Sequence, residues 1–216
     1  MQKFAARFGH AWVFLYFAVY LPWFYWLEQT VTQDYYILRT ELDLRIPFWE
    51  GAVIPYLLWF PFVALTVAWF FFHNKSEFYR LILHLYAGMT VFLIVCTIFP
   101  NGLDLRPAVL PRDNVCSRLV QFIWAVDTPT NVLPSLHVYN SLACCSAVFR
   151  SAALRGRSGV RAGTALLTVS IILSTMLIKQ HSIVDVVTAL ALFMVFYVLI
   201  YEPQPQRRSD LVRDRG

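Results

Sequence analysis

The seven residues from Lys179 to Asp185 hold the side chains of this sequence that are best suited to chemistry. His181 and Asp185 are four positions apart, so on a helix the two side chains lie on one face. A carboxylate beside an imidazole holds the ring in one tautomer and stabilises its protonated form, which leaves the other ring nitrogen as a nucleophile or a base. An almost wholly apolar run follows as far as Tyr201. An ionisable pair at the mouth of such a run is typical of a functional site in a membrane, and a purely structural pairing is the alternative.

A second histidine stands in the segment Pro134-Ser135-Leu136-His137. His137 could act as a general acid or base opposite His181. The proline predicts that a helix begins here, and the free backbone N–H groups at a helix N-terminus form a natural anion site. Ser135 can add a hydroxyl to that site, or it can simply cap the helix.

Arg106 and Lys179 are candidate ligands for phosphate oxygens, although either could be a solvated loop charge when taken alone. Two histidines, a carboxylate and two cations together suit phosphoryl transfer through a phosphohistidine, with the cations neutralising the phosphate oxygens. This scheme needs neither a metal nor another cofactor, and the sequence has no carboxylate cluster to hold a metal ion.

The composition indicates an integral membrane protein. Hydrophobic residues make up 58% of the 216 positions and charged residues only 14%, whereas a soluble domain has about 25% charged residues. The net charge of +5 does not indicate nucleic-acid binding, because the positive side chains are spread between the apolar runs. The four cysteines show no metal-binding or disulfide spacing.

The order of the apolar runs predicts an all-α protein in which one domain, residues 1–201, spans the membrane six times and is followed by a short cytoplasmic tail, residues 202–216. Each run has about the length needed to cross a hydrocarbon core. A short surface helix is expected at 117–126, and the acidic loop 28–50 is either a lid or a solvated loop. The six predicted spans cover residues 11–27, 51–72, 81–99, 134–150, 162–178 and 181–201.

The distribution of lysine and arginine predicts the orientation. Most of these residues lie in the N-terminal segment, in the links after the second and fourth spans, and in the tail. The positive-inside rule then places both termini in the cytoplasm. It also brings Arg106, His137, Lys179 and His181 together at the extracytoplasmic end of the bundle.

Three segments resemble the ordered motifs of the type 2 phosphatidic acid phosphatase family. They are Arg106-Pro107, then Pro134 to His137, then Ser174 followed by His181 and Asp185. The resemblance implies a six-helix membrane phosphatase that needs no metal and acts on a lipid phosphate within the bilayer. By the same resemblance, His181 is the nucleophile, Asp185 its partner and His137 the general acid. Phosphate-binding roles fall to Arg106, Ser135 and Ser174.

The sequence departs from that family at three positions. Phe99 stands where the family has a lysine, Leu136 where it has a glycine, and Thr175 where it has an arginine. Lys179 could replace one missing cation. The sequence Lys179-Gln180-His181 and the leucine are more similar to the branch that contains the inositolphosphorylceramide synthases. Three functions therefore remain open: a lipid phosphatase, a lipid head-group phosphotransferase, and a non-enzymatic transporter or structural membrane protein.

Overall fold

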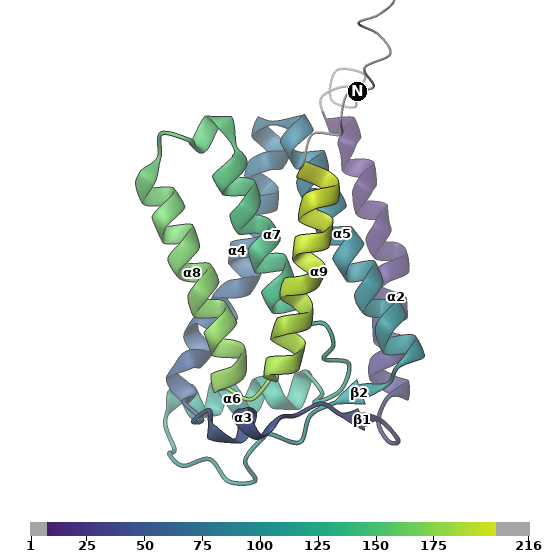
Figure 1. Ribbon diagram of the computed structural model, residues 1–216, viewed down its shortest axis with the longest axis vertical. Helices are drawn as coiled ribbons and strands as arrows, with labels where there is room; N and C mark the ends of the chain where they lie inside the picture. Colours follow the sequence, from purple (N-terminus) through teal and green to yellow (C-terminus); the bar gives the residue numbers. More distant parts are fainter. Residues whose placement is uncertain (1–7, 202–216) are drawn as a thin grey trace, which may run out of the picture.

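The computed structural model describes residues 8–201; the tail predicted at 202–216 lies outside the described residues. The chain is mostly helical, and its long helices run lengthwise through the molecule (Figure 1). The first rod is a 3-10 segment, Gly9–Tyr16, that continues into α2, Phe17–Thr30. The other long helices are α4 (Val53–His73), α5 (Lys75–Ile98), α7 (Leu136–Arg150), α8 (Ser158–Leu177) and α9 (Ile183–Tyr201).

The shorter elements gather mainly at one end of this bundle, the lower end in Figure 1. There α6 (Val115–Val126) and α3 (Glu41–Arg45) lie below the long helices, and a 3-10 turn at Glu50–Ala52 leads into α4. Two short strands, β1 (Tyr36–Ile37) and β2 (Asn101–Gly102), pair in parallel. A further 3-10 turn, Ala152–Leu154, joins α7 to α8. The surface helix predicted at 117–126 corresponds to α6.

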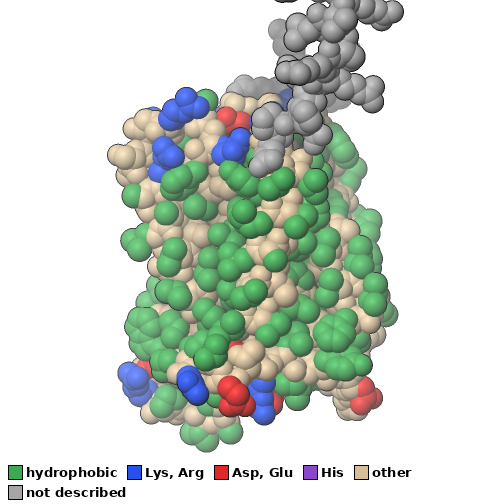
Figure 2. Space-filling view, viewed as in Figure 1, with side chains coloured by type: hydrophobic (Ala, Val, Ile, Leu, Met, Phe, Trp, Pro, Cys, Tyr) green, Lys and Arg blue, Asp and Glu red, His purple; other side chains and the backbone are tan. Residues whose placement is uncertain are grey.

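Four helices in the described part of the chain are long and apolar enough to cross a membrane. The N-terminal rod divides into a 3-10 segment and a 14-residue helix, and α7 has only 15 residues, so neither reaches the length of a single apolar span. Hydrophobic side chains cover the middle of the molecule, while charged side chains gather at its two ends (Figure 2). The membrane character is thus supported, and the six predicted spans remain a prediction. The spanning candidates are Glu50–His73, Lys75–Ile98, Ser158–Leu177 and Ile183–Tyr201.

Polar residues set where several helices begin. The side chains of Asn74, Asn114 and Ser135 each accept a hydrogen bond from the backbone N–H three positions later, at the starts of α5, α6 and α7. Each bond satisfies one of the N–H groups that a helix N-terminus leaves without a partner. The last of these caps sets the start of α7 directly before His137.

Helix α7 is the centre of the bundle and packs against α4, α5, α8 and α9. Its packing against α5 depends on Gly88, where an added Cβ would overlap the ring of Tyr139. The Tyr139 hydroxyl donates to the carbonyl of His84, at a distance of 2.8 Å. Small residues that let two helices approach closely are typical of packing inside membranes.

We expect Gly88→Ala to destabilise the protein by about 1–3 kcal/mol, because the new methyl group overlaps the buried Tyr139 ring. Thermal unfolding in detergent would measure this loss. Gly163→Ala is the matched control, since an added Cβ meets no atom within 4 Å there. An unchanged unfolding midpoint in Gly88→Ala would contradict this account of the α5–α7 contact.

Candidate active site

Two histidines from distant parts of the sequence meet at the end of the bundle where α7 and α9 begin. His181 Nε2 lies 3.4 Å from His137 Nδ1, and His181 Nδ1 lies 3.3 Å from Asp185 Oδ2. The three side chains therefore form one row. His181 is buried and Asp185 fully so, and burial strengthens electrostatic interactions within such a row.

The contact between His181 and Asp185 does not arise as the sequence spacing predicted. Both were expected on one helix, but α9 begins at Ile183, so His181 lies in the turn before it. Asp185 reaches back from the first helical turn. Its Oδ2 accepts from the backbone N–H of Ser182 at 2.8 Å, and the Ser182 hydroxyl accepts from the backbone N–H of Asp185 at 3.3 Å. This reciprocal pair is a capping box, which fixes the carboxylate beside the imidazole.

His137 is held between two aromatic rings of α4. Its ring centre lies 4.5 Å from that of Tyr56, in a stacked arrangement, and 4.3 Å from that of Trp59. These contacts fix the plane of the imidazole so that Nδ1 faces His181. The second nitrogen, Nε2, is buried and has no hydrogen-bond partner among the residues that the structure describes. Such an unpaired nitrogen is a group that a substrate could satisfy.

Ser135 joins the two helix starts that carry the histidines. Its side chain caps α7 by accepting from the N–H of Val138 at 3.4 Å, and its own N–H donates to the carbonyl of Asp185 at 3.2 Å. The hydroxyl therefore acts as a helix cap, and a phosphate-binding role for it remains a prediction.

Arg106 approaches the site from the long loop after α5. Its guanidinium donates to the carbonyl oxygens of Trp124 and Asp127, at 3.1 and 2.7 Å, and to the side-chain oxygen of Gln180. Burial lowers the pKa of this group from its ordinary value. The Nε–H is buried and, within residues 8–201, has no hydrogen-bond partner. A held guanidinium with a free donor is suited to binding an oxyanion.

The other two predicted phosphate ligands face different partners. Lys179 has a positive φ of 60°, and its ammonium donates to the carbonyls of Asp43 and Ile46, at 3.0 and 2.6 Å. Burial lowers the pKa of Lys179, against the opposing effect of the Asp43 charge. The Ser174 hydroxyl donates to the carbonyl of Ile171 within its own helix, at 2.7 Å. These bonds do not bring either side chain to the histidine pair.

The acidic loop 28–50, for which the sequence left a lid and a solvated loop as alternatives, contains a residue that contacts the site. Asp43 is buried, and its Oδ1 accepts from the N–H of Ile183, the first residue of α9, at 2.8 Å. Its Oδ2 accepts from both the N–H and the hydroxyl of Thr40, which closes a capping box on α3. Together with the Lys179 contact, this bond ties α3 to the turn that carries His181.

A second carboxylate, Asp127, was also missed from the sequence. Its Oδ2 accepts from the side-chain N–H of Gln180 at 2.8 Å and from the hydroxyl of Tyr56 at 3.1 Å. Asp127 is only partly exposed, and desolvation raises its pKa, while the nearby charges of His181 and Arg106 act in the opposite direction. In the sequence, only the position of Gln180 next to His181 pointed to the network that contains Asp127.

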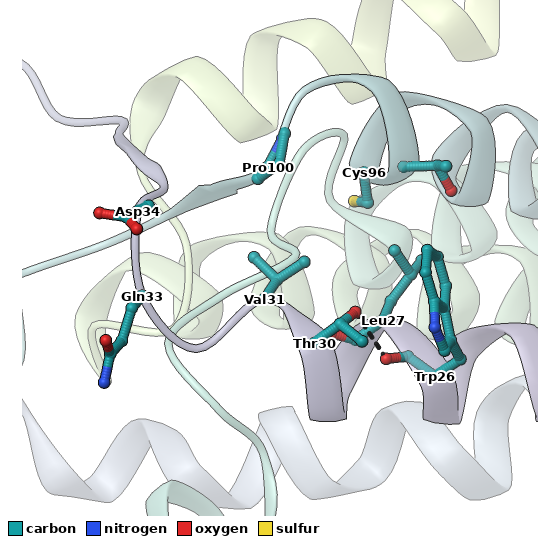
Figure 3. A pocket seen from close by; sticks show the side chains of 9 residues that line it. Trp26, Leu27, Thr30, Val31, Gln33, Asp34, Cys96 and Pro100 are labelled. Carbon is teal, nitrogen blue, oxygen red and sulfur yellow. Dashed lines mark hydrogen bonds between the residues drawn. The ribbon is translucent and has the colours of Figure 1, made fainter.

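A cavity that neither histidine lines lies beside this site. It has a volume of about 190 Å³ and lies between the ends of α2 and α5 (Figure 3). The inner wall includes Cys96, whose thiol donates to the carbonyl of Leu133, two residues before Ser135. The cavity is lined by Trp26, Leu27, Thr30, Val31, Gln33, Asp34, Cys96, Thr97 and Pro100.

The site can therefore offer a nucleophilic nitrogen, a proton donor and an anion-binding guanidinium within one network. In the described part of the chain, no three His, Cys, Asp or Glu side chains gather into a group that could hold a metal ion. No family model, curated protein or solved structure matches this chain.

Proposed function

We propose that this protein is an integral membrane lipid phosphatase that hydrolyses a lipid phosphate monoester or pyrophosphate through a phosphohistidine. The observation that carries the proposal is the row formed by His137, His181 and Asp185, with the nitrogens of the two rings 3.4 Å apart. The resemblance of the same residues to type 2 phosphatidic acid phosphatases supports the assignment. The apolar middle of the molecule, which has helices long enough to cross a membrane, supports a substrate that lies in the bilayer.

The proposed reaction has two steps. In the first, His181 Nε2 attacks phosphorus and the P–O bond to the lipid breaks. Protonated His137 gives its Nδ1 proton to the leaving lipid oxygen. Asp185 stabilises the positive charge that the phosphorylated His181 ring carries. In the second step His137 removes a proton from water, whose oxygen attacks phosphorus, and the N–P bond breaks to release inorganic phosphate.

This reaction requires the two imidazole rings to separate when substrate binds. Reacting atoms approach to about 3–3.5 Å before attack, and a proton donor lies about 2.6–3.2 Å from the oxygen it protonates. A phosphoryl group and its leaving oxygen do not fit between nitrogens that are 3.4 Å apart.

The charge distribution supports an extracytoplasmic site. Four arginines lie in the link between α7 and α8 and in the helix turns that adjoin it, and this region is at the opposite end of the molecule from α6 and the start of α9 (Figure 1). Cytoplasmic links are enriched in positive residues. We therefore assign the arginine-rich end and both termini to the cytoplasm, and the histidine pair to the other side. The four residues are Arg150, Arg155, Arg157 and Arg161.

A head-group phosphotransferase is the second candidate, because position 99 carries no cation for the phosphate. Phe99 instead stacks on Tyr36, with ring centres 4.7 Å apart. In such an enzyme, the first step breaks the P–O bond between the phosphate and the lipid of a phosphodiester, so that the lipid alcohol leaves with the His137 proton and the phosphorylated head group stays on His181. The head group then passes from His181 to the oxygen of an acceptor alcohol, from which His137 removes the proton.

The test is product formation by the purified protein in detergent with EDTA, from a panel of lipid phosphates, pyrophosphates and phosphodiesters. We expect release of inorganic phosphate at a rate that does not depend on an added alcohol. If products form only when an alcohol acceptor is present, the transferase replaces the phosphatase. If no substrate reacts under either condition, both enzymatic proposals are contradicted.

A further inference from the structure

The network behind Arg106 contains an acidic group to which the proposed reaction gives no task. The Asp127 carboxylate does not contact the histidines through a hydrogen bond; it contacts Gln180 and Tyr56 instead. We infer that Asp127 is a positioning residue: it fixes the direction of the Gln180 side-chain amide and so aims the guanidinium of Arg106 at a phosphate oxyanion. The inference rests on the proposed function in one respect only, that the anion is a phosphate.

The argument begins with the two ends of the Gln180 amide. Its Nε2 donates to Asp127 Oδ2 at 2.8 Å and lies 3.3 Å from the Tyr56 hydroxyl, while its Oε1 accepts from Arg106. An ionised carboxylate can only accept hydrogen bonds, whereas an amide has one accepting and one donating end. Asp127, as an acceptor at the NH2 end, therefore holds the amide in the direction in which the oxygen of Gln180 faces the guanidinium, and without Asp127 the NH2 end keeps only the longer contact to the Tyr56 hydroxyl.

The direction of the amide matters because, among the three acceptors that hold Arg106 in the described chain, Gln180 supplies the one that is a side chain and can turn. Its Nη1 donates to the Trp124 carbonyl, and its Nη2 donates to the Asp127 carbonyl and to Gln180. These three acceptors leave the buried Nε–H free of partners in residues 8–201. If the amide reversed, two donors would face one another, and the guanidinium would turn away from this position. The free Nε–H would then no longer point where a phosphate oxygen binds.

Because the network is buried, a change at Asp127 has a large effect on the affinity for phosphate. Gln180 is buried, with 4% of its surface exposed, and it directly precedes His181. Hydrogen bonds between buried groups and a charged partner are worth more than those at the surface. A change at Asp127 therefore acts on the anion site through Gln180, although Asp127 itself does not touch the phosphate.

The test is the affinity of the purified full-length protein for inorganic phosphate, measured from the rise of the unfolding midpoint with phosphate concentration. We expect Asp127→Ala to weaken phosphate binding by about 10- to 100-fold, the loss that accompanies one hydrogen bond to a charged group. Asp127→Asn should bind within about threefold of the wild type, because its side-chain oxygen can still accept from Gln180. Asp104→Ala is the control, since Asp104 lies in the same loop but pairs with Arg39 at the surface.

A second change separates orientation from packing. In Asp127→Ala/Gln180→Glu the new carboxylate has no donating end, so either of its oxygens accepts from Arg106 and phosphate binding should recover. A merely structural role of Asp127 would not be rescued in this way. Full binding by Asp127→Ala, loss of binding in Asp127→Asn equal to that in Asp127→Ala, or no recovery in the double variant would each overturn the inference.

The proposed function and this inference can fail separately. If the wild-type protein binds phosphate in the expected pattern but hydrolyses no lipid phosphate, the phosphatase is contradicted and the role of Asp127 stands. If the wild-type protein binds no phosphate at all, Arg106 is not an anion ligand and the role of Asp127 is overturned. If Asp127→Ala fails to fold, Asp127→Asn still tests the inference, because a loss of phosphate binding beyond about threefold in that variant would overturn it.

Discussion

Replacing His181 with alanine should reduce phosphate release from a lipid phosphate by about 10⁴-fold or more, since loss of a nucleophile removes the whole covalent pathway. The side chain is the middle member of the row, with one nitrogen facing Asp185 and the other facing His137. No neighbouring side chain in the described residues has the same two contacts. The measurement is the initial rate of phosphate release at saturating substrate.

His73→Ala is the matched control for this experiment. His73 is exposed, and its ring bonds only to the carbonyl of Trp69 in its own helix, at the other end of α4 from Tyr56. We expect its rate to equal that of the wild type. Unfolding midpoints of both variants close to that of the wild type would show that the loss of activity in His181→Ala comes from the missing nucleophile and not from unfolding. Turnover by a folded His181→Ala protein within tenfold of the wild-type rate would contradict the phosphohistidine mechanism.

The second large effect is expected at Asp185. We expect Asp185→Asn to lower kcat by about 10²- to 10⁴-fold, because the variant lacks the charge that stabilises the phosphorylated His181 ring and can hold that ring in the wrong tautomer. Asp185 Oδ2 accepts from both His181 and Ser182, and Oδ1 is buried without a partner in the described chain. An asparagine NH2 group at the Oδ2 position would donate to His181 Nδ1 and hold the ring in the wrong tautomer, whereas at the Oδ1 position it would be buried without an acceptor in the described chain.

The measurement for Asp185→Asn is kcat and KM at several substrate concentrations, beside the unfolding midpoint. The substituted side chain keeps an oxygen that can accept from Ser182, so the start of α9 should remain formed. A fall in kcat with little change in KM would indicate a role in the chemical steps. A kcat within threefold of the wild-type value would show that this carboxylate serves only the helix cap.

Much of the helical arrangement could be predicted, because a helix that crosses a membrane needs an apolar run of about 20 residues. The runs at 51–72, 81–99, 162–178 and 181–201 correspond to the four helices that can cross a membrane, with ends that differ by a few residues. The N-terminal run was harder to interpret, since its first part forms a 3-10 segment, Gly9–Tyr16, that hydropathy does not distinguish from an α-helix. The start of α9 shifted to Ile183 because the Ser182 cap, rather than the apolar run, sets it.

The supporting residues of the site could not be predicted from local sequence. Asp43 bonds to a backbone N–H 140 positions away, and Asp127 bonds to a side chain 53 positions away. Such contacts depend on how the loops fold over the end of the bundle, and no periodic pattern encodes them. Lys179 had the right charge for a phosphate ligand, but its ammonium donates to the carbonyls of Asp43 in α3 and of Ile46 just after it. The charge of a residue alone therefore did not reveal its partner.

Direct detection of the covalent intermediate tests the central claim most directly. The purified protein would be mixed with a lipid phosphate that carries radioactive phosphorus, quenched within the first turnover, and analysed for labelled residues. We predict label on His181 that is stable in alkali and released by acid, as expected of a phosphohistidine, and none in His181→Ala. Phosphate release by the wild-type protein without any labelled protein, or with the label on another residue, would contradict the mechanism.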